Sequence, residues 1–207
     1  MKEIILASKS PRRHELLNLL GIDHKVIPCK EDEKEVKNNN AEYDESIQIT
    51  SIEEQILEVA KQKVYCVEKL LPKDGTDYLI IGADTIVVIE DEIIGKPKSS
   101  DDAVLMLQKI MGHIHDVFTG LFILDTKTGS SFTGIEKTRV SMLLPSLNKI
   151  KAYIQAENVL DKAGAYAIQG KGAAFIDWID GCFYNVMGLP LSKIVSLLEQ
   201  AGYEYLK

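Results

Sequence analysis

A carboxylate lies in an unfavourable position in the middle of this sequence. Asp84 belongs to the stretch 82–85, Gly-Ala-Asp-Thr, which interrupts two strongly apolar runs at 78–81 and 86–89. Because an unpaired charge is costly to bury, this aspartate is expected to be paired with a cation or bound to a metal ion. The alternative is that Asp84 caps a bend in its own backbone. We favour a functional carboxylate.

A second pattern, near the N-terminus, is typical of an anion site. Residues 3–7 form a short apolar run that predicts a buried strand. Ser10 followed by Pro11 marks a helix start, with the serine as a side-chain cap. Arg12 and Arg13 then fall in the first turn, where free amides favour an anion and two cations oppose the helix dipole. A bound polyanion would remove that conflict, so we expect a phosphate site; two solvated surface arginines are the alternative.

Two lysines occupy positions that an anion would explain. Ser51 and Glu54 form a capping box that predicts a helix from 51 to about 71. Lys63 falls on the apolar side of that helix, where a lysine must either extend to solvent or meet an anion. Lys96 lies between a glycine and a proline on a constrained loop next to the strand of Asp84.

Two polar residues are held as weaker candidates. Gln169 lies in a stretch rich in glycine and alanine, 161–172, which would let the backbone approach a ligand closely. Its amide has both a donor and an acceptor and could read the edge of a nucleobase, although a glycine-rich turn explains the stretch equally well. Residues 30–46 are charged and of low complexity and predict an exposed loop. Glu33 is kept from that loop because it lies near the preceding strand end.

The rest of the chain is expected to form further strands and helices. We expect no internal repeat and no linker between independent domains. The expected strands are 24–29, 78–81, 86–89, 113–124, 131–143, 174–179 and 182–186. Helices are expected after 51, after a cap at Ser99 or Ser100, after 146 and after 190. The last of these helices has an expected apolar face of Leu191, Ile194, Leu197 and Leu198. A turn at 125–129 joins the two long strands, and a hairpin about 180–181 joins the last two.

Composition and charge limit the class of protein. The 207 residues are 45% hydrophobic and 27% charged, as in a soluble globular protein, and we expect one domain over 1–207. A net charge of -7 argues against a nonspecific nucleic-acid binder, but a local cation cluster can still attract a phosphorylated ligand. No stretch predicts a signal peptide or a membrane span, so we expect a cytoplasmic protein with no membrane partner.

The cysteines and histidines give no metal pattern. The three cysteines, Cys29, Cys66 and Cys182, are widely spaced and are expected to be free thiols in a reducing cytosol. His113 and His115 alternate along an expected strand without further ligands nearby, so they are expected to be ordinary surface histidines.

Taken together, these motifs resemble those of the Maf proteins, the septum-formation-inhibitor family of nucleoside triphosphate pyrophosphatases. The resemblance runs nearly from end to end and keeps the family's order, and the forms Ser-Pro-Arg-Arg, Gly-Ala-Asp-Thr and Ile-Gln-Gly resemble the branch that acts on dTTP and UTP. The segment after Glu33 is longer than in typical members. The matching motifs are at 6–17 (Leu-Ala-Ser-Lys-Ser-Pro-Arg-Arg-His-Glu-Leu-Leu), 82–85, 95–97 (Gly-Lys-Pro), 161–166 (Asp-Lys-Ala-Gly-Ala-Tyr), 168–170 and 188–190 (Gly-Leu-Pro).

The resemblance implies a fold and a reaction. The implied fold is α/β, with a long, mixed, twisted sheet flanked by helices and two lobes around a central cleft, as in Maf and inosine-triphosphatase proteins. Such proteins are commonly assembled as homodimers. The implied reaction is metal-dependent hydrolysis of dTTP and UTP, and of modified pyrimidine nucleotides, between the α- and β-phosphates, giving the monophosphate and pyrophosphate. The alternatives are a 7-methyl-GTP pyrophosphatase and a non-catalytic, nucleotide-binding regulator of cell division.

The resemblance also implies roles for residues of this chain. The general base matches Asp84, and a divalent cation, Mg²⁺ or Mn²⁺, would be held by Glu33 and Asp84. The implied substrate-binding residues are Ser8, Ser10, Arg13, Lys63 and Lys96. The positions implied to select the base are Arg12, Thr85 and Gln169.

Overall fold

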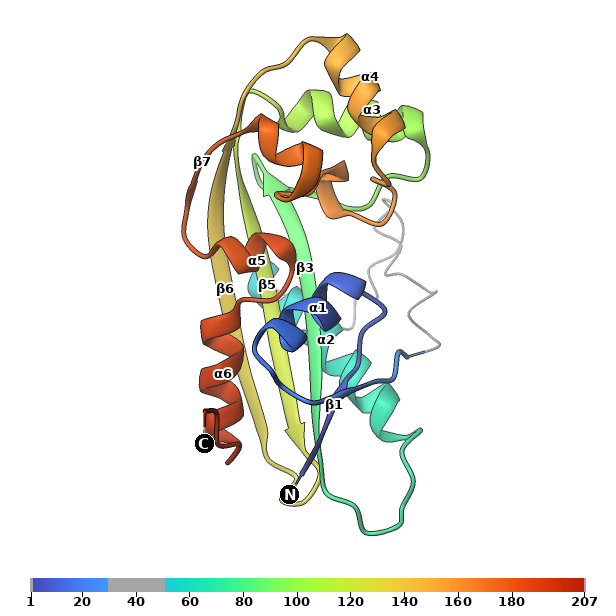
Figure 1. Ribbon diagram of the computed structural model, residues 1–207, viewed down its shortest axis with the longest axis vertical. Coiled ribbons are helices and arrows are strands. Elements are labelled where there is room, and N and C mark those ends of the chain that lie inside the picture. The colour runs from blue at the N-terminus through green and yellow to red at the C-terminus, as the bar shows by residue number, and fades with distance from the viewer. Residues whose placement is uncertain (1, 30–50, 207) are drawn as a thin grey trace. The chain divides into compact units, whose positions relative to one another are not determined.

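The computed structural model describes residues 2–29 and 51–206 (Figure 1). In these ranges seven strands form one mixed sheet in the order β2-β1-β3-β5-β6-β7, with β4 paired to β3. The strands are β1 (Glu3–Leu6), β2 (Lys25–Val26), β3 (Tyr78–Ile89), β4 (Glu92–Ile94), β5 (Ile114–Asp125), β6 (Ser131–Met142) and β7 (Ile176–Asp180). The helices are α1 (Pro11–Leu19), α2 (Ile52–Glu68), α3 (Ser100–Ile110), α4 (Leu147–Ala156), α5 (Phe183–Met187) and α6 (Leu191–Gln200), with 3₁₀ turns η2 (Ala163–Ala165) and η3 (Gly170–Phe175). The predicted α/β class, with a mixed sheet flanked by helices, is confirmed.

The chain forms two compact units. Unit 1 consists of Met1–Asp84, Thr119–Ile135 and Leu191–Lys207, and unit 2 consists of Thr85–Phe118 and Glu136–Pro190. Strands β3, β5 and β6 each contribute residues to both. The expectation of one domain over 1–207 stays a prediction.

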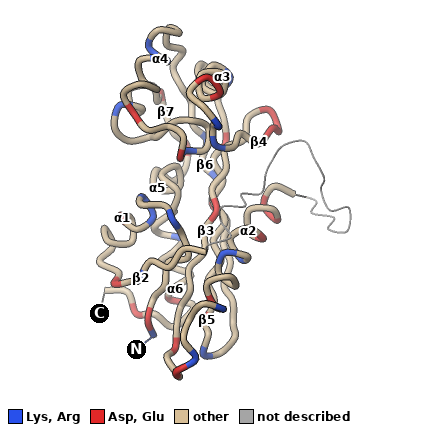
Figure 2. Tube along the Cα trace, turned by 90° about the vertical axis from the view of Figure 1, so that its right-hand side faces the viewer, with Lys and Arg blue, Asp and Glu red and all other residues tan. Residues whose placement is uncertain are grey.

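In unit 1, helices α1 and α2 lie on opposite sides of the sheet at β3, as two views at right angles show (Figure 1 and Figure 2). The predicted capping box starts α2: Ser51 accepts from the Glu54 amide, and the Glu54 carboxylate accepts from the Ser51 amide. The buried face of α2 then packs into a core with β1, β3 and β5, and this fixes the helix against the sheet. That core contains Ile5, Ala7, Ala60, Val64, Val67, Tyr78, Ile80, Phe122 and Leu124.

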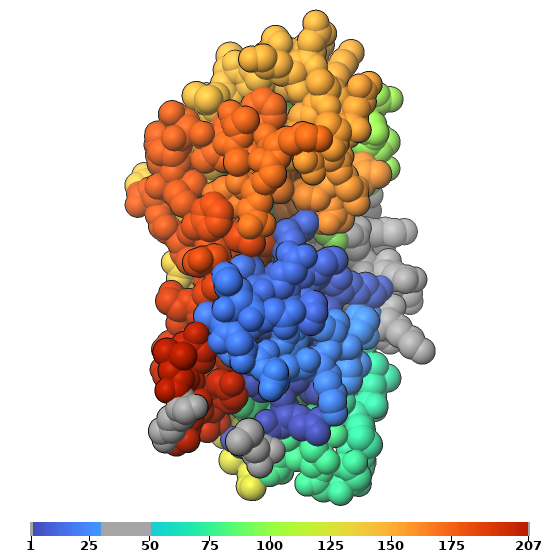
Figure 3. Space-filling model, in the orientation of Figure 1, coloured from blue at the N-terminus to red at the C-terminus, as the bar shows by residue number. Residues whose placement is uncertain are grey.

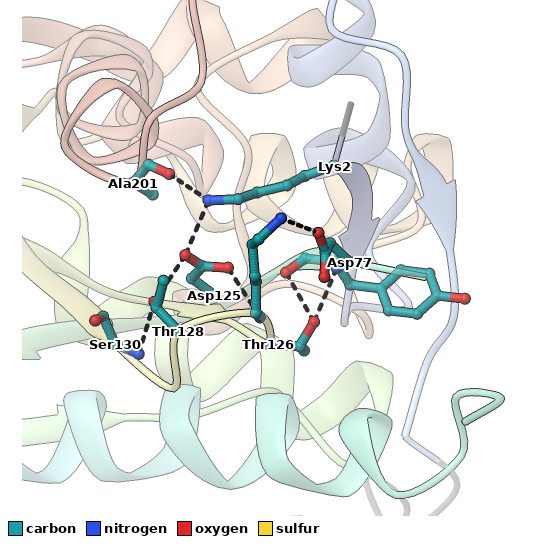
Figure 4. Close-up of polar contacts among 9 residues, drawn as sticks. Lys2, Asp77, Asp125, Thr126, Thr128, Ser130 and Ala201 are labelled. Atoms are coloured by element: carbon teal, nitrogen blue, oxygen red, sulfur yellow. Dashed lines mark hydrogen bonds and ion pairs between the residues drawn. The ribbon is translucent and has the colours of Figure 1, made fainter. Parts of the chain in front are cut away.

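The two ends of the described chain meet in unit 1. The space-filling view shows the N-terminal segment beside the C-terminal one (Figure 3). Lys2 connects them, because its ammonium donates to the Ala201 carbonyl at 2.9 Å and to the buried Asp125 carboxylate at 2.8 Å (Figure 4). Burial alone would raise the pKa of Asp125, but hydrogen bonds from Lys2 and Thr128 outweigh it and hold this pKa below its ordinary value.

Unit 2 has its own core, in which α3 and α4 pack together with η2 and the adjoining strands. The predicted cap of α3 is confirmed, because Ser99 accepts from the Asp102 amide at 3.1 Å. The aromatic pair Tyr153 and Phe175 closes this core edge-to-face, with ring centroids 5.4 Å apart.

The predicted break at 82–85 is wrong, since β3 runs without interruption through these residues. The strand stays extended because β1 pairs with its first half, with Leu6 opposite Ile81, and β4 pairs with its second half, with Val87 opposite Ile94. A glycine inside a strand often marks close approach of another element, and here that element is α2.

The predicted strand 182–186 is also wrong, because Phe183–Met187 is the short helix α5. A short apolar run does not distinguish a strand from a helix turn, and the choice is made by tertiary hydrogen bonds. The predicted strand 24–29 is reduced to two residues, Lys25–Val26, and the three-residue strand β4 was not predicted.

Two predictions about single side chains are wrong. Cys29 and Cys66 form a disulfide within unit 1, so only Cys182 is a free thiol among the described residues. Their separation of 37 residues gives no pairing signal, and the fold alone brings them together. The predicted surface position of His115 is also wrong, since this residue is buried. Its ring nitrogen Nε2 lies 2.7 Å from the Tyr166 hydroxyl, to which it is hydrogen-bonded.

No helix in the described ranges is long and apolar enough to cross a membrane.

Candidate active site

The parallel pairing of β1 with β3 places two candidate segments side by side. Leu6 lies opposite Ile81, and the Ala7 amide donates to the Ile81 carbonyl at 2.8 Å. Continuing this register, the turn that begins at Ser8 runs beside Ala83 and Asp84. The carboxyl end of a parallel strand followed by a helix is where α/β proteins commonly bind phosphorylated ligands.

Ser8 organises the turn between β1 and α1. It is 3% exposed, and its hydroxyl accepts from Arg13 Nη1 at 3.1 Å and from the Ser10 amide at 3.2 Å. Ser10 occupies the N-cap of α1 as predicted, but its side chain makes no capping bond, so that part of the prediction is wrong.

Arg13 is held inside the first turn of α1. It is 8% exposed and lies on the same helix face as Leu16 and Leu17, three and four residues later. A buried guanidinium beside the free amides of a helix N-terminus suits an anion with several oxygens. Arg12, one residue earlier in the same turn, is half-buried.

Lys63 and Asp84 form an ion pair with each other. The sequence predicted a cation or metal partner for Asp84, and an anion or solvent for Lys63. Lys63 Nζ lies 2.8 Å from Asp84 Oδ1 and 3.3 Å from the Ala83 carbonyl oxygen. The two side chains are 17% and 22% exposed, so the ion pair is shielded but still in partial contact with solvent. The bend-capping alternative for Asp84 is not what the structure shows.

Gly82 is the reason that Lys63 can reach Asp84. A Cβ atom at position 82 would overlap the carbonyl oxygen of Ala60 and lie 2.6 Å from Val64 Cγ2. Residues 82 and 84 point to the same side of β3, since side chains alternate along a strand. Close contact of α2 at Gly82, through Ala60 and Val64, therefore brings the same turn of that helix, which carries Lys63, over Asp84.

The other candidates belong to unit 2, which begins at Thr85. The Thr85 hydroxyl donates to the Gly188 carbonyl at 3.4 Å. Lys96 and Gln169 are both exposed, and their segments are joined by a hydrogen bond from the Gly164 amide to the Gly95 carbonyl at 3.0 Å. The segment 161–170 thus lies against the loop that carries Lys96.

Glu33, the second expected metal ligand, lies outside the described residues. Within the described ranges no group of three or more histidine, cysteine, aspartate or glutamate side chains could hold a metal ion by itself. Of the two expected metal ligands, Asp84 is the one that lies in the described ranges, and its carboxylate offers oxygen ligands. Mg²⁺ is often bound in this way, by one or two carboxylates together with substrate phosphates and water.

Sequence reasoning missed three residues on which the local packing depends. Gly82 was read only as a strand interruption, and Thr138 and Asn185 were not singled out, although both are fully buried and hydrogen-bonded to one another. The signal for Asn185 was present, because a lone amide within the apolar run Phe-Tyr-Asn-Val-Met needs buried partners.

Comparison with known proteins places the whole chain in one family. A family model described as Maf-like protein matches residues 3–201. The chain is 42% identical over 207 residues to a dTTP/UTP pyrophosphatase of Caldicellulosiruptor bescii, covering 100% of this chain and 98% of the relative. It is 41% identical over 210 residues to one of Acetivibrio thermocellus (100% and 99% covered), and 39% identical over 204 residues to one of Clostridium botulinum (98% of each). The chain belongs to the Maf family.

Proposed function

We propose that this protein hydrolyses dTTP and UTP to the nucleoside monophosphate and pyrophosphate. Full-length relatives at about 40% identity are named dTTP/UTP pyrophosphatases, and the chain has charged side chains of the kind that such a reaction needs. The observation that carries the proposal is the shielded pair of Lys63 and Asp84, placed by strand register beside the β1–α1 turn with its buried arginine.

Hydrolysis of an anhydride requires an activated water and a stabilised leaving group. Asp84 acts as the general base and accepts a proton from the attacking water. Lys63 balances Asp84 before substrate binds, and the triphosphate oxygens then compete for the same ammonium. When Lys63 shifts from Asp84 to the phosphate oxygens, the carboxylate becomes able to accept a proton from the positioned water. Lys63 then stabilises the negative charge that develops on the leaving pyrophosphate.

The polyphosphate is held chiefly by unit 1 residues. Arg13 presents its guanidinium from the first turn of α1, and the turn Ser8–Ser10 adds backbone and hydroxyl donors. Lys96 supplies a further cation for the departing pyrophosphate. Arg12, Thr85 and Gln169 select the base, since their donors and acceptors suit the O2, N3–H and O4 edge of a pyrimidine.

A divalent cation, Mg²⁺ or Mn²⁺, completes the site when substrate binds. Asp84 and Glu33 are its protein ligands in this proposal, and the donor set of oxygen atoms fits a hard cation. Bound there, the ion would neutralise the phosphate oxygens and polarise the anhydride. We further propose that the protein acts as a homodimer in the cytoplasm.

The test is a substrate panel. Purified protein with Mg²⁺ is assayed for pyrophosphate release from dTTP, UTP, CTP and 7-methyl-GTP, and the values of kcat/KM are compared. The proposal expects dTTP and UTP to be preferred. A preference for 7-methyl-GTP would assign the chain the other specificity, and release from none of the four would favour a nucleotide-binding regulator.

A further inference from the structure

A buried polar cluster in unit 2 connects β5, β6 and α5. Thr138 and Asn185 are both fully buried. The Thr138 hydroxyl accepts from the Cys182 amide at 3.0 Å and from Asn185 Nδ2 at 3.0 Å, and it donates to the Cys182 carbonyl at 3.1 Å. The second hydrogen of the Asn185 amide goes to the Val117 carbonyl at 2.9 Å. One hydroxyl therefore makes three hydrogen bonds, and one amide group uses both of its donors.

This cluster sets the position of α5. A helix of five residues is too short to be stable by itself, so its place must come from tertiary contacts. Its N-cap residue, Cys182, is hydrogen-bonded to Thr138 through both its amide and its carbonyl, and Asn185, the third residue of the helix, is bonded to Thr138 and Val117. Gly181, with φ +128°, allows the approach, because a Cβ there would lie 2.9 Å from Thr138 Oγ1.

The other end of α5 carries the carbonyl that Thr85 contacts. The helix ends at Gly188, which has φ 112°, and its amide donates to the Asn185 carbonyl at 2.9 Å. The Gly188 carbonyl accepts from the Thr85 hydroxyl. A carbonyl can only accept, so the single hydrogen of this hydroxyl is committed to Gly188, and Thr85 can offer a further ligand only its lone pairs.

We propose that Thr138 and Asn185 are positioning residues for substrate choice, acting through Gly188 on Thr85. They hold the carbonyl that makes the Thr85 hydroxyl an acceptor, and an acceptor suits the N3–H of uracil and thymine. The same hydroxyl opposes cytosine, whose N3 is itself an acceptor. This inference rests on the proposed function and adds to it the group that distinguishes UTP from CTP.

The experiment compares kcat/KM for UTP with kcat/KM for CTP by pyrophosphate release. Thr138→Val, which keeps the shape and removes the hydroxyl, is expected to lower the UTP to CTP ratio by about tenfold, because the Thr85 hydroxyl can then donate its hydrogen to N3 of cytosine. Thr138→Ser keeps the hydroxyl and should stay within about threefold of the wild-type ratio. The matched control is Thr133→Val, the same change at an exposed position of β6, and it should leave the ratio unchanged.

Melting curves are recorded first, since Thr138→Val removes three buried hydrogen bonds. Asn185→Ser removes two hydrogen bonds. If the valine variant does not fold, the UTP to CTP ratio of this variant is compared with that of the wild type instead. Thr85→Val should lower the ratio as well, and combining it with the Thr138 or Asn185 variant should add little, because the two changes act on one contact. Equal losses for UTP and CTP, with an unchanged ratio, would overturn the inference and leave the proposed function standing. A wild-type protein that does not turn over UTP would overturn both.

Discussion

Lys63 Nζ contacts Asp84 Oδ1 at 2.8 Å and the carbonyl of the preceding residue, Ala83, at 3.3 Å. The lysine comes from the middle of α2 and the aspartate from the middle of β3, 21 residues further along the chain. Lys63 and Asp84 are each a charged residue among apolar neighbours in the sequence, and in the fold each supplies the charge that the other needs. A shielded pair of this kind is a candidate for a catalytic or binding role.

The role of Asp84 is tested by Asp84→Asn. The amide has the same size but accepts a proton poorly, so turnover of dTTP is expected to fall by about 10²–10⁴ while nucleotide binding is largely retained. Steady-state pyrophosphate release and calorimetric titration with a nonhydrolysable dTTP analogue measure the two quantities. Substantial remaining turnover would mean that another group acts as the base.

Gly82→Ala is expected to destabilise the protein and separate the pair at the site. The new methyl group would overlap the Ala60 carbonyl oxygen and Val64 Cγ2, so α2 must move away from β3. Overpacking of this kind costs about 1–3 kcal/mol of unfolding free energy. Urea unfolding measures the loss, and Gly95→Ala, where no atom lies within 4 Å of the new Cβ, is the control that should change stability by less than about 1 kcal/mol. Equal stability of the two variants would contradict the close contact.

The buried His115 predicts a dependence of stability on pH. Burial lowers its pKa from 6.5 to about 4, against a smaller raising effect of Asp116, so the folded protein holds the ring neutral. Below pH 6.5 the unfolded chain takes up a proton that the folded chain does not. Stability is therefore complete above pH 6.5 and falls as the pH decreases to 4, by up to about 3 kcal/mol.

Urea midpoints between pH 4.5 and 7.5 measure this effect. His115→Gln should be less stable at neutral pH, and its midpoint should vary much less over the window. His113→Gln alters an exposed histidine two residues away and should keep the full wild-type dependence. A wild-type midpoint that does not change between pH 4.5 and 6.5 would rule out a neutral, buried His115.

The disulfide predicts sensitivity to a reducing agent. Cys29 and Cys66 close a loop across a sequence separation of 37, which in the chain-entropy description stabilises the folded state by about 4 kcal/mol. Dithiothreitol should lower the urea midpoint of the wild-type protein, and the double variant Cys29→Ser, Cys66→Ser should begin at the lower value and not respond. Cys182→Ser should respond as the wild type does, because this cysteine is not in the disulfide. An unchanged wild-type midpoint would show that the two thiols are unpaired in solution.

Elements with local signals were predictable from the sequence. The caps at Ser51 and Ser99, the turn at 125–129 and the apolar face of α6 were all confirmed, because each depends on residues within a few positions of one another. Among the candidate site residues, Arg13, Lys63 and Asp84 stand out in the sequence because their charges conflict with their local surroundings.

The features that failed depend on partners distant in the chain. The continuity of β3 at Gly82 is decided by pairing with β1 and β4 and by packing under α2. The helical form of α5 is decided by Thr138 on β6, which lies 47 residues before Asn185. No spacing rule predicts such contacts, so the close approach at Gly82 and the buried cluster of Thr138 and Asn185 emerged only with the fold.

The contact at Gly82 also limits which second mutations could rescue a substitution there. The added Cβ would meet three atoms, one in the Val64 side chain and two in the backbone of Ala60. A smaller residue at 64 removes the first obstacle, but every residue at 60 keeps the carbonyl oxygen that forms the second. Second mutations that rescue Gly82→Ala are therefore expected at positions that let α2 shift as a whole, and not at Ala60 or Val64, which contact position 82 directly. A selection for restored activity would recover them outside the contact itself.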